Sequence, residues 1–256
     1  MTTRDDRGSD LQRSLALLWA GRSRGKRGPR PRLTAEQIAR AAIRIADADG
    51  LEALSMQRIA SDLGFATMSL YNHVASKDLL LEVMVDVAAG KPPDLGGASD
   101  LRPAVRRWVA ALWAGFRSHP WLLRVPLDHT PIGPNQLAWL DRLLRPLLGA
   151  GLAAGEARAA ALHLTAVVRG TAQISLDMGS AHKTDGGRPR TEAELVLALS
   201  DLVTADDYPA LAAVHAAETA DHGAEPLGED ALPAELAFGV DRFLDGIEAW
   251  TAERTG

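Results

Sequence analysis

The sequence predicts an all-α protein, and composition is the first reason. The 256-residue chain contains 45 Ala and 37 Leu, against 20 residues of Ile and Val together. Ala and Leu favour helices and β-branched residues favour strands, so a fold built on a sheet is not expected. Apolar residues make up 46% of the chain, which is enough for a packed core and argues against a chain that is disordered throughout. The length allows one large domain or two smaller ones.

Composition also excludes several classes of protein. Cysteine is absent, which rules out disulfides, thiol catalysis and Cys-ligated metal centres. No phosphate-binding Gly loop, nucleophile elbow or zinc-binding His pair is present, so neither an enzyme nor a bound cofactor or metal is expected. No apolar run approaches the roughly 20 residues of a membrane span, and the polar start of the chain lacks a secretory signal. We therefore expect a cytoplasmic protein with no membrane partner.

Charge is distributed unevenly along the chain. The net charge is −5, yet residues 22–32 hold six basic side chains and no acid, while residues 183–235 hold twelve acids and three bases. Gly and Pro within residues 22–32 exclude a regular helix. Residues 1–32 are therefore predicted to form an extension, with a short amphipathic stretch over 11–20 followed by a mobile basic arm. Such an arm could enter a DNA minor groove, and the alternative is a solvated tail.

Two helices with clear start and stop signals follow the arm. The segment from Thr34 to Gln37 fits a capping box, and the apolar repeat that it opens ends at Gly50. A second helix runs from Ser55, a typical N-cap residue, to Gly64.

A short third helix over Thr67–Val74 comes after a three-residue turn, and a fourth helix runs from Ser76 to Gly90. This order predicts a helix-turn-helix domain over residues 33–90. The third helix is too short to be stable alone, so Leu70 and Val74, four residues apart, are expected to hold it against the first two helices.

The rest of the chain, residues 98–256, is predicted to form a second helical domain. Turn formers fill residues 128–134, a Gly/Pro-rich charged loop covers 179–190, and a second, acidic loop runs to Pro233. The expected helices span residues 101–118, 135–148, 155–178, a weaker pair within 191–217, and 233–252.

The third and last of these strong helices, 155–178 and 233–252, each carry an apolar face. Two such helices from each of two copies would form a four-helix bundle, so a homodimer is expected. Gly239 and Gly246 cost roughly 1 kcal/mol each inside a helix. Close approach of a partner helix would justify them, and the alternative is that they are tolerated at the surface.

The outward face of the short third helix points to DNA recognition. Thr67, Asn72 and His73 offer groups that can hydrogen-bond to base edges or phosphates in a major groove. Met68 and Ser69 lie on the same helix. The alternative is an ordinary helical hairpin with no role in binding.

Residues 33–90 also resemble the N-terminal domain of the TetR family of transcriptional regulators. The match is densest in LSMQRIASDLGFATMSLYNHVASKDLLL, residues 54–81. The resemblance implies an all-α homodimer, with Gln57 contacting bases or phosphates and with Tyr71 and Lys77 clamping the phosphate backbone. Relatives often carry a bulky aromatic or Arg at the position of Asn72, which leaves the operator sequence open. The predicted DNA-binding residues are Arg27, Arg30, Arg32, Ser55, Gln57, Thr67, Met68, Ser69, Tyr71, Asn72, His73 and Lys77.

The segment HPWLLRVPLDHTPIGPNQLAWLDRLL, residues 119–144, is similar to the ligand domain of the tetracycline-repressor type. This similarity implies a small, partly hydrophobic effector. Aromatic side chains are concentrated between Trp108 and Trp139; each could line a ligand cavity or simply belong to the core. His119 is one of three His residues considered as metal ligands, and without His pairs at i,i+4 no metal is expected. The predicted effector contacts are Trp113, Phe116, Trp121, His129, Trp139 and His163.

Two hypotheses remain open on the sequence. The first is a ligand-responsive regulator, by default a repressor released from a palindromic operator by its effector. The second is a helical ligand-binding or interaction protein with a vestigial helix-turn-helix. The basic arm distinguishes them, because the second hypothesis has no use for it.

Overall fold

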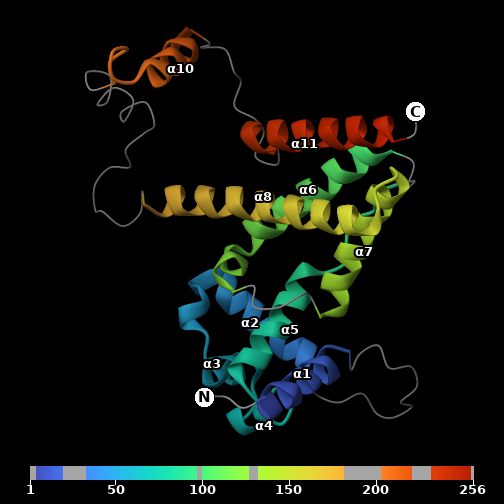
Figure 1. The fold of residues 1–256 in the computed structure, drawn as a ribbon. Helices are drawn as coiled ribbons and strands as arrows, with labels where there is room; N and C mark the ends of the chain where they lie inside the picture. Colours follow the sequence, from blue (N-terminus) through green and yellow to red (C-terminus); the bar gives the residue numbers. More distant parts are fainter. Residues whose placement is uncertain are drawn as a thin grey trace. The chain divides into compact units, whose positions relative to one another are not determined.

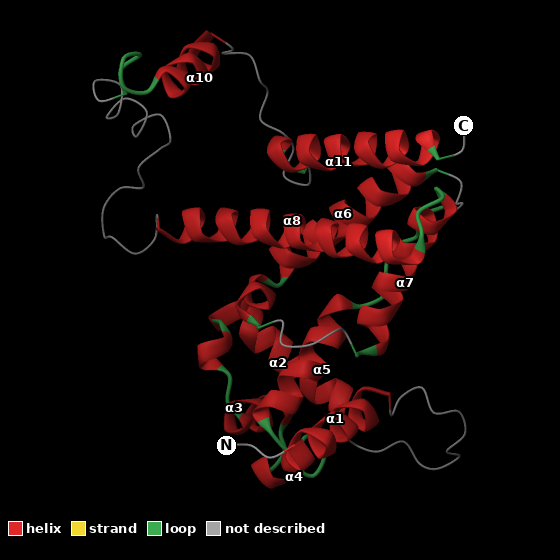
Figure 2. Ribbon diagram, viewed as in Figure 1, coloured by secondary structure: helices red, strands yellow, loops and turns green. Residues whose placement is uncertain are grey.

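The computed structural model describes residues 4–19, 33–96, 100–126, 132–181, 203–220 and 232–254. Every regular element within these ranges is helical, so the predicted all-α fold is confirmed (Figure 2). The chain forms two compact units, one made of Met1–Ala172 with Ala234–Gly256 and the other of Gln173–Pro233. No helix in the described ranges is long and apolar enough to cross a membrane.

Four helices of the first unit form the helix-turn-helix region, coloured blue to teal in Figure 1. They are α2 (Ala35–Asp49), α3 (Met56–Leu63), α4 (Thr67–Tyr71) and α5 (Lys77–Ala89). The start and stop signals in the sequence act as predicted. The Thr34 side chain accepts from the Gln37 N–H, and the Gln37 side chain accepts from the Thr34 N–H in return. Gly64 ends α3 with φ +71°, a left-handed conformation that favours glycine.

Two local features differ from the sequence prediction. A short 3₁₀ helix, η2 (Leu51–Ala53), joins α2 to α3 and was not expected. The helix α4 ends at Tyr71 rather than at Val74, because the N–H groups of His73 and Val74 both bond to the Leu70 carbonyl and tighten the chain into a turn.

The core of this region forms around α2 and α5. Leu70 and Val74 are both 0% exposed, which confirms that these two side chains hold α4 against its neighbours. Ile38 of α2 and Ile59 of α3 belong to the same buried cluster, together with Met84 of α5. A helix of five residues is therefore kept in place by packing rather than by its own propensity.

A helix precedes the basic segment and is longer than the predicted stretch over 11–20. This helix, α1 (Arg4–Trp19), packs against α5. Leu17 and Leu18 lie against the core cluster, and the Trp19 Nε1–H donates to the Ile132 carbonyl at 3.0 Å. The extension is thus tied to the domain before the basic segment begins.

The C-terminal part contains α6 (Leu101–Ser118), the 3₁₀ helix η3 (Pro120–Arg124), α7 (Pro134–Gly149), α8 (Ala154–Ala181) and α11 (Ala234–Glu253). The predicted helices over 101–118, 135–148, 155–178 and 233–252 are confirmed to within a few residues, and η3 was not expected. The loop predicted from residue 179 was placed too early, because α8 continues to Ala181.

Several other predicted segments lie wholly or partly outside the described residues. The basic arm and most of residues 128–134 are among them, as is the first half of the weak helix pair within 191–217. The second half of that pair corresponds to α10 (Pro209–Ala220), in the second unit.

Ion pairs join α6 to α11. Arg102 donates to the carboxylates of Asp245 and Glu248 at 2.6 and 2.7 Å. Arg106 donates to both oxygens of Asp241 at 2.8 and 2.5 Å, which holds the Asp241 pKa below its ordinary value. Beneath these pairs, α11 buries four side chains: Leu236, Val240, Leu244 and Ile247.

Candidate DNA-binding surface and effector region

The outward face of α4 is open to solvent. Met68 is 71% exposed and Tyr71 is also exposed, as are Asn72 and His73 just after the helix, whereas Leu70 is buried in the core. Thr67 and Ser69 are partly exposed. No acidic residue occurs between residues 64 and 77, so no like charge on this segment would oppose phosphate. The face can approach the edges of base pairs.

Residues on the flanking helices complete the described part of the predicted surface. Gln57 is exposed in the first turn of α3, and the Ser55 side chain accepts from the Arg58 N–H as the cap of that helix. Lys77 is exposed at the first position of α5, where the positive end of the helix dipole adds to its attraction for a phosphate. Arg27, Arg30 and Arg32 lie outside the described residues.

The aromatic residues predicted to bind an effector occupy different surroundings. Trp113 and Phe116 are buried on α6. Trp121 lies in the core cluster of the helix-turn-helix region, and Trp139 hydrogen-bonds to the end of α5. These contacts fit the core alternative, and an additional contact with a ligand stays a prediction.

The histidines of the same set also make protein contacts where they are described. The His163 ring is exposed and lies 4.5 Å, centroid to centroid, from the Phe243 ring of α11. His129 is outside the described residues. No group of three or more His, Asp and Glu side chains in the described ranges is arranged to hold a metal ion.

Two carboxylates that the sequence analysis did not single out connect the helix-turn-helix region to the C-terminal helices. Asp86 of α5 is 4% exposed and accepts backbone N–H groups at the start of α7. Asp47 of α2 accepts from the Trp121 Nε1–H at 2.7 Å, and the His119 Nδ1 lies 2.8 Å from the same oxygen. The signal for Asp86 was a lone acid in the apolar stretch VMVDVAA; nothing local marks Asp47.

A cation on α8 holds η3 in place. The guanidinium of Arg169 donates to the carbonyls of Leu122, Leu123 and Val125 at 3.2, 2.8 and 2.8 Å. Burial lowers the pKa of Arg169, which nevertheless stays positively charged at neutral pH. Because η3 also carries Trp121, a chain of contacts runs from α8 through η3 to α2.

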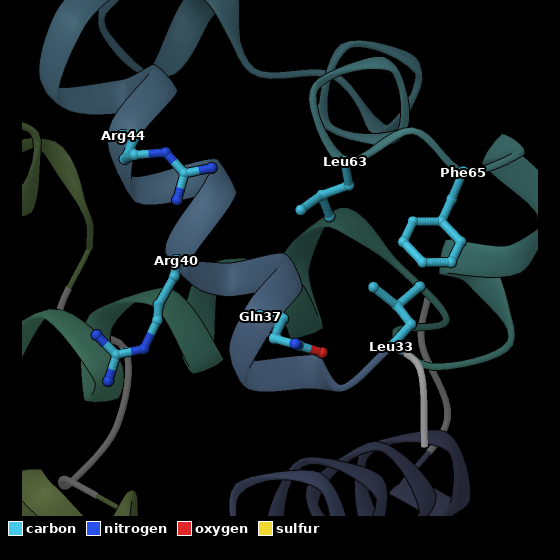
Figure 3. Close-up of a pocket in the computed structure, with 6 residues that line it drawn as sticks. All are labelled: Leu33, Gln37, Arg40, Arg44, Leu63 and Phe65. Carbon is cyan, nitrogen blue, oxygen red and sulfur yellow. The ribbon is translucent and has the colours of Figure 1, made fainter. Parts of the chain in front are cut away.

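A surface pocket of about 190 Å³ lies on the helix-turn-helix region (Figure 3). Leu33, Leu63 and Phe65 converge on its apolar side, and Gln37 lies between them and the arginines of α2. The two arginines are already paired, Arg40 with Glu36 and Arg44 with Asp62, each at 2.8 Å. The volume is below the roughly 300–1,000 Å³ of typical ligand sites. None of the predicted effector contacts lines this pocket.

The fold and the exposed recognition helix define a helix-turn-helix DNA-binding protein with a helical C-terminal region. Residues 38–84 match the model for bacterial regulatory proteins of the tetR family, and residues 93–251 match the tetracyclin repressor-like C-terminal domain. The chain belongs to the TetR family of DNA-binding transcriptional regulators. It is accordingly a regulator and not an enzyme.

Individual relatives agree with the family. The chain is 34% identical to the HTH-type transcriptional repressor DrrR1 of Streptomyces coeruleorubidus over 257 aligned positions, covering 96% of this chain and 89% of DrrR1. It is 31% identical to an HTH-type transcriptional regulator of Saccharopolyspora erythraea, over 72% of this chain and 75% of that protein. The crystal structure of apo ActR from Streptomyces coelicolor superposes with a TM-score of 0.68 at 25% identity, covering 88% of this chain and all of ActR.

Proposed function

We propose that the protein is a homodimeric repressor that leaves a palindromic operator when a small, partly hydrophobic effector binds. The observation that supports this proposal is the exposed face of α4, which the buried side chains of Leu70 and Val74 hold against the core. In this assignment Thr67, Met68, Ser69, Asn72 and His73 face the bases. The phosphate backbone is held by Tyr71 and Lys77, and Gln57 contacts a base or a phosphate, with Ser55 at the start of α3 and the basic arm beside them.

A mobility-shift assay with the DNA that flanks the gene tests DNA binding, and footprinting then defines the operator. Lys77→Ala should weaken binding to every site by a similar factor and reduce the slope of affinity against salt by about one. Lys91→Ala, an exposed lysine after α5, is the matched control and should leave binding unchanged.

Asn72→Ala tests the base-reading face in the same assay. It should change which operator variants are preferred, because base contacts specify sequence and phosphate contacts do not. An unaltered preference would mean that Asn72 does not face the bases.

Exposed apolar residues on α8 and α11 support the dimer. Leu162 of α8 is 72% exposed and Phe238 of α11 is 68% exposed. A Cβ built on Gly239 or Gly246 meets no atom of the described residues within 4 Å, so the described part of the chain does not require glycine there. A partner helix crossing close to α11 would require it. A dimer would place the recognition helices about 34–36 Å apart on successive major grooves. Light scattering tests the oligomeric state, and a stable monomer at micromolar concentration would refute the dimer.

Effector control is supported by the ActR relative. ActR has been crystallised with (S)-DNPA, in a structure that matches this chain at 25% identity with a TM-score of 0.63, and with actinorhodin. We place the effector in the C-terminal domain, residues 98–256, with Trp113, Phe116, Trp121, His129, Trp139 and His163 as candidate contacts. Binding would tilt α5 and change the separation of the two recognition helices, for which a coupling of about 1–3 kcal/mol is sufficient.

Calorimetry with those two compounds, followed by operator titration with and without any compound that binds, tests this control. Binding in the C-terminal domain should lower operator affinity by about 5–150-fold. A bound compound that leaves operator affinity unchanged would refute release by a tilt of α5. A protein that binds ligand but no DNA would favour the vestigial helix-turn-helix instead.

A further inference from the structure

A buried carboxylate of α5 caps a different helix. Asp86 lies one turn before the end of α5, and its Oδ1 accepts the backbone N–H groups of Asn135 and Gln136 at 2.9 and 3.0 Å. These N–H groups belong to the first turn of α7 and have no partner within that helix. The negative charge also faces the positive end of the α7 dipole, which helps to compensate its burial.

The residue that precedes α7 explains why the cap comes from another helix. The N-cap of α7 is Gly133, which has no side chain to accept a hydrogen bond. Its φ of −75° is open to any residue, so backbone conformation does not require glycine. The available space does require glycine, because a Cβ on Gly133 would lie 2.1 Å from Asp86 Oδ1. Glycine here makes room for the carboxylate.

The helix α7 in turn caps the end of α5. The Trp139 Nε1–H donates to the carbonyls of Ala89 and Gly90 at 2.9 and 3.3 Å, and the Asn135 side chain donates to the Asp86 carbonyl at 2.9 Å. Trp139 is itself held from α6. The Trp108 Nε1–H donates to the Trp139 carbonyl at 3.1 Å, and the two rings meet edge to face at 5.9 Å.

We propose that Asp86 is a positioning residue for operator recognition: the reciprocal capping by Asp86 and Trp139 joins α5 and α7 into one rigid body and thereby sets the half-site spacing that the dimer accepts. This inference rests on the proposed function. From Asp86 to Lys77, α5 rises about 14 Å, so a tilt of about 15° displaces the DNA-facing end by about 3.5 Å, close to one base-pair step. A small loosening of the contact between α5 and α7 is therefore enough to weaken the preference of the dimer for one half-site spacing.

The test measures binding to the footprinted operator and to versions with one base pair added or removed between the half-sites. Asp86→Asn keeps the size of the side chain and removes its charge, whereas Gly133→Ala keeps Asp86 and pushes its carboxylate away. Both variants should reduce the preference for the natural spacing by about fivefold or more. The matched controls are Asp141→Asn, an exposed acid on α7, and Gly115→Ala, where an added Cβ meets no atom within 4 Å; both should keep the wild-type ratio.

The ratio between spacings separates positioning from simple destabilisation, which would weaken all operators equally. In the absence of DNA, Asp86→Asn should also speed hydrogen exchange of the Asn135 and Gln136 amides by about tenfold or more. If Asp86→Asn does not fold, the same spacing ratio is measured with Gly133→Ala and Trp139→Phe instead. A wild-type protein that binds no DNA would overturn the proposed function. If the wild-type protein binds DNA and the variants keep its spacing ratio, this inference is overturned and the proposed function is not.

Discussion

The helix-turn-helix region is connected to the C-terminal helices in two places that are built differently. In the joint, formed by Asp86, Gly133, Asn135 and Trp139, the hydrogen bonds end on backbone groups of α5 and α7. In the bridge, formed by Asp47, His119, Trp121 and Arg169, the hydrogen bonds to α2 run from side chain to side chain. Arg169 holds η3 by hydrogen bonds to its carbonyls.

The two connections differ in how easily they can move. The backbone groups in the joint are fixed by their helices, so a slide of α7 along α5 would stretch several of these part-buried hydrogen bonds at once. The bridge ends on the carboxylate of Asp47, which is partly exposed and can turn, or exchange a protein donor for water, at small cost. We expect the joint to stay fixed while the bridge adjusts.

Arg169→Ala should have the largest effect on stability. It removes the donor to the carbonyls of Leu122 and Leu123 in η3 and of Val125 just after it, together with a cation that lies 6.0 Å from the Phe116 ring. The expected loss is about 2–4 kcal/mol in the free energy of unfolding, measured by urea denaturation. Arg145→Ala, which breaks an exposed i,i+4 pair with Asp141, is the control at about 0.3–0.5 kcal/mol. Equal losses would show that η3 does not depend on α8.

Trp121→Phe should weaken the bridge without leaving a large cavity in the core. The ring volume is largely kept, but the hydrogen bond to Asp47 is lost, for an expected cost of about 1–2 kcal/mol because water can replace part of it. His119→Ala, which leaves that bond in place, should cost less. Amide exchange should increase at the end of α2 and not at the start of α7. Faster exchange at α7 would mean that the two connections are not independent.

Trp19→Phe tests whether α1 braces the joint from outside. It removes the donor to the Ile132 carbonyl, one residue before Gly133, and should cost about 0.5–1.5 kcal/mol. Leu11→Ala, an exposed residue on the same helix, should change stability by less than about 0.5 kcal/mol. If exchange in the first turn of α7 is the same in both variants, α1 contributes stability but does not support the joint.

Local signals in the sequence predicted most of the fold. Thr34, Ser55 and Gly64 act through neighbours three or four residues away, so their roles could be deduced from spacing, and the exposed face of α4 followed from Leu70 and Val74. The joint and the bridge could not be found this way. Asp86 and Asn135 are 49 residues apart, and Asp47 and Trp121 are 74 apart, so each partnership exists only after the helices pack. The same limit applies to Trp19, Trp108, Trp121 and Trp139, whose N–H groups donate to residues on other elements.

The smallest change in stability is expected at the ion pairs between α6 and α11. These pairs lie outside both connections, so they serve as a reference for a change that affects neither. Arg106 lowers the Asp241 pKa below its ordinary value of 3.8, so this carboxylate stabilises the fold above that pH and loses its contribution as the pH falls through the lowered value. Asp241→Asn should therefore reduce the urea midpoint slightly at about pH 6, and the gap to wild type should narrow as the pH is lowered below 3.8. High salt should narrow it as well, because the pair is near solvent. Amide exchange at the joint and the bridge should not change; a gap that persists at low pH would mean that Asp241 acts through packing and not through its charge.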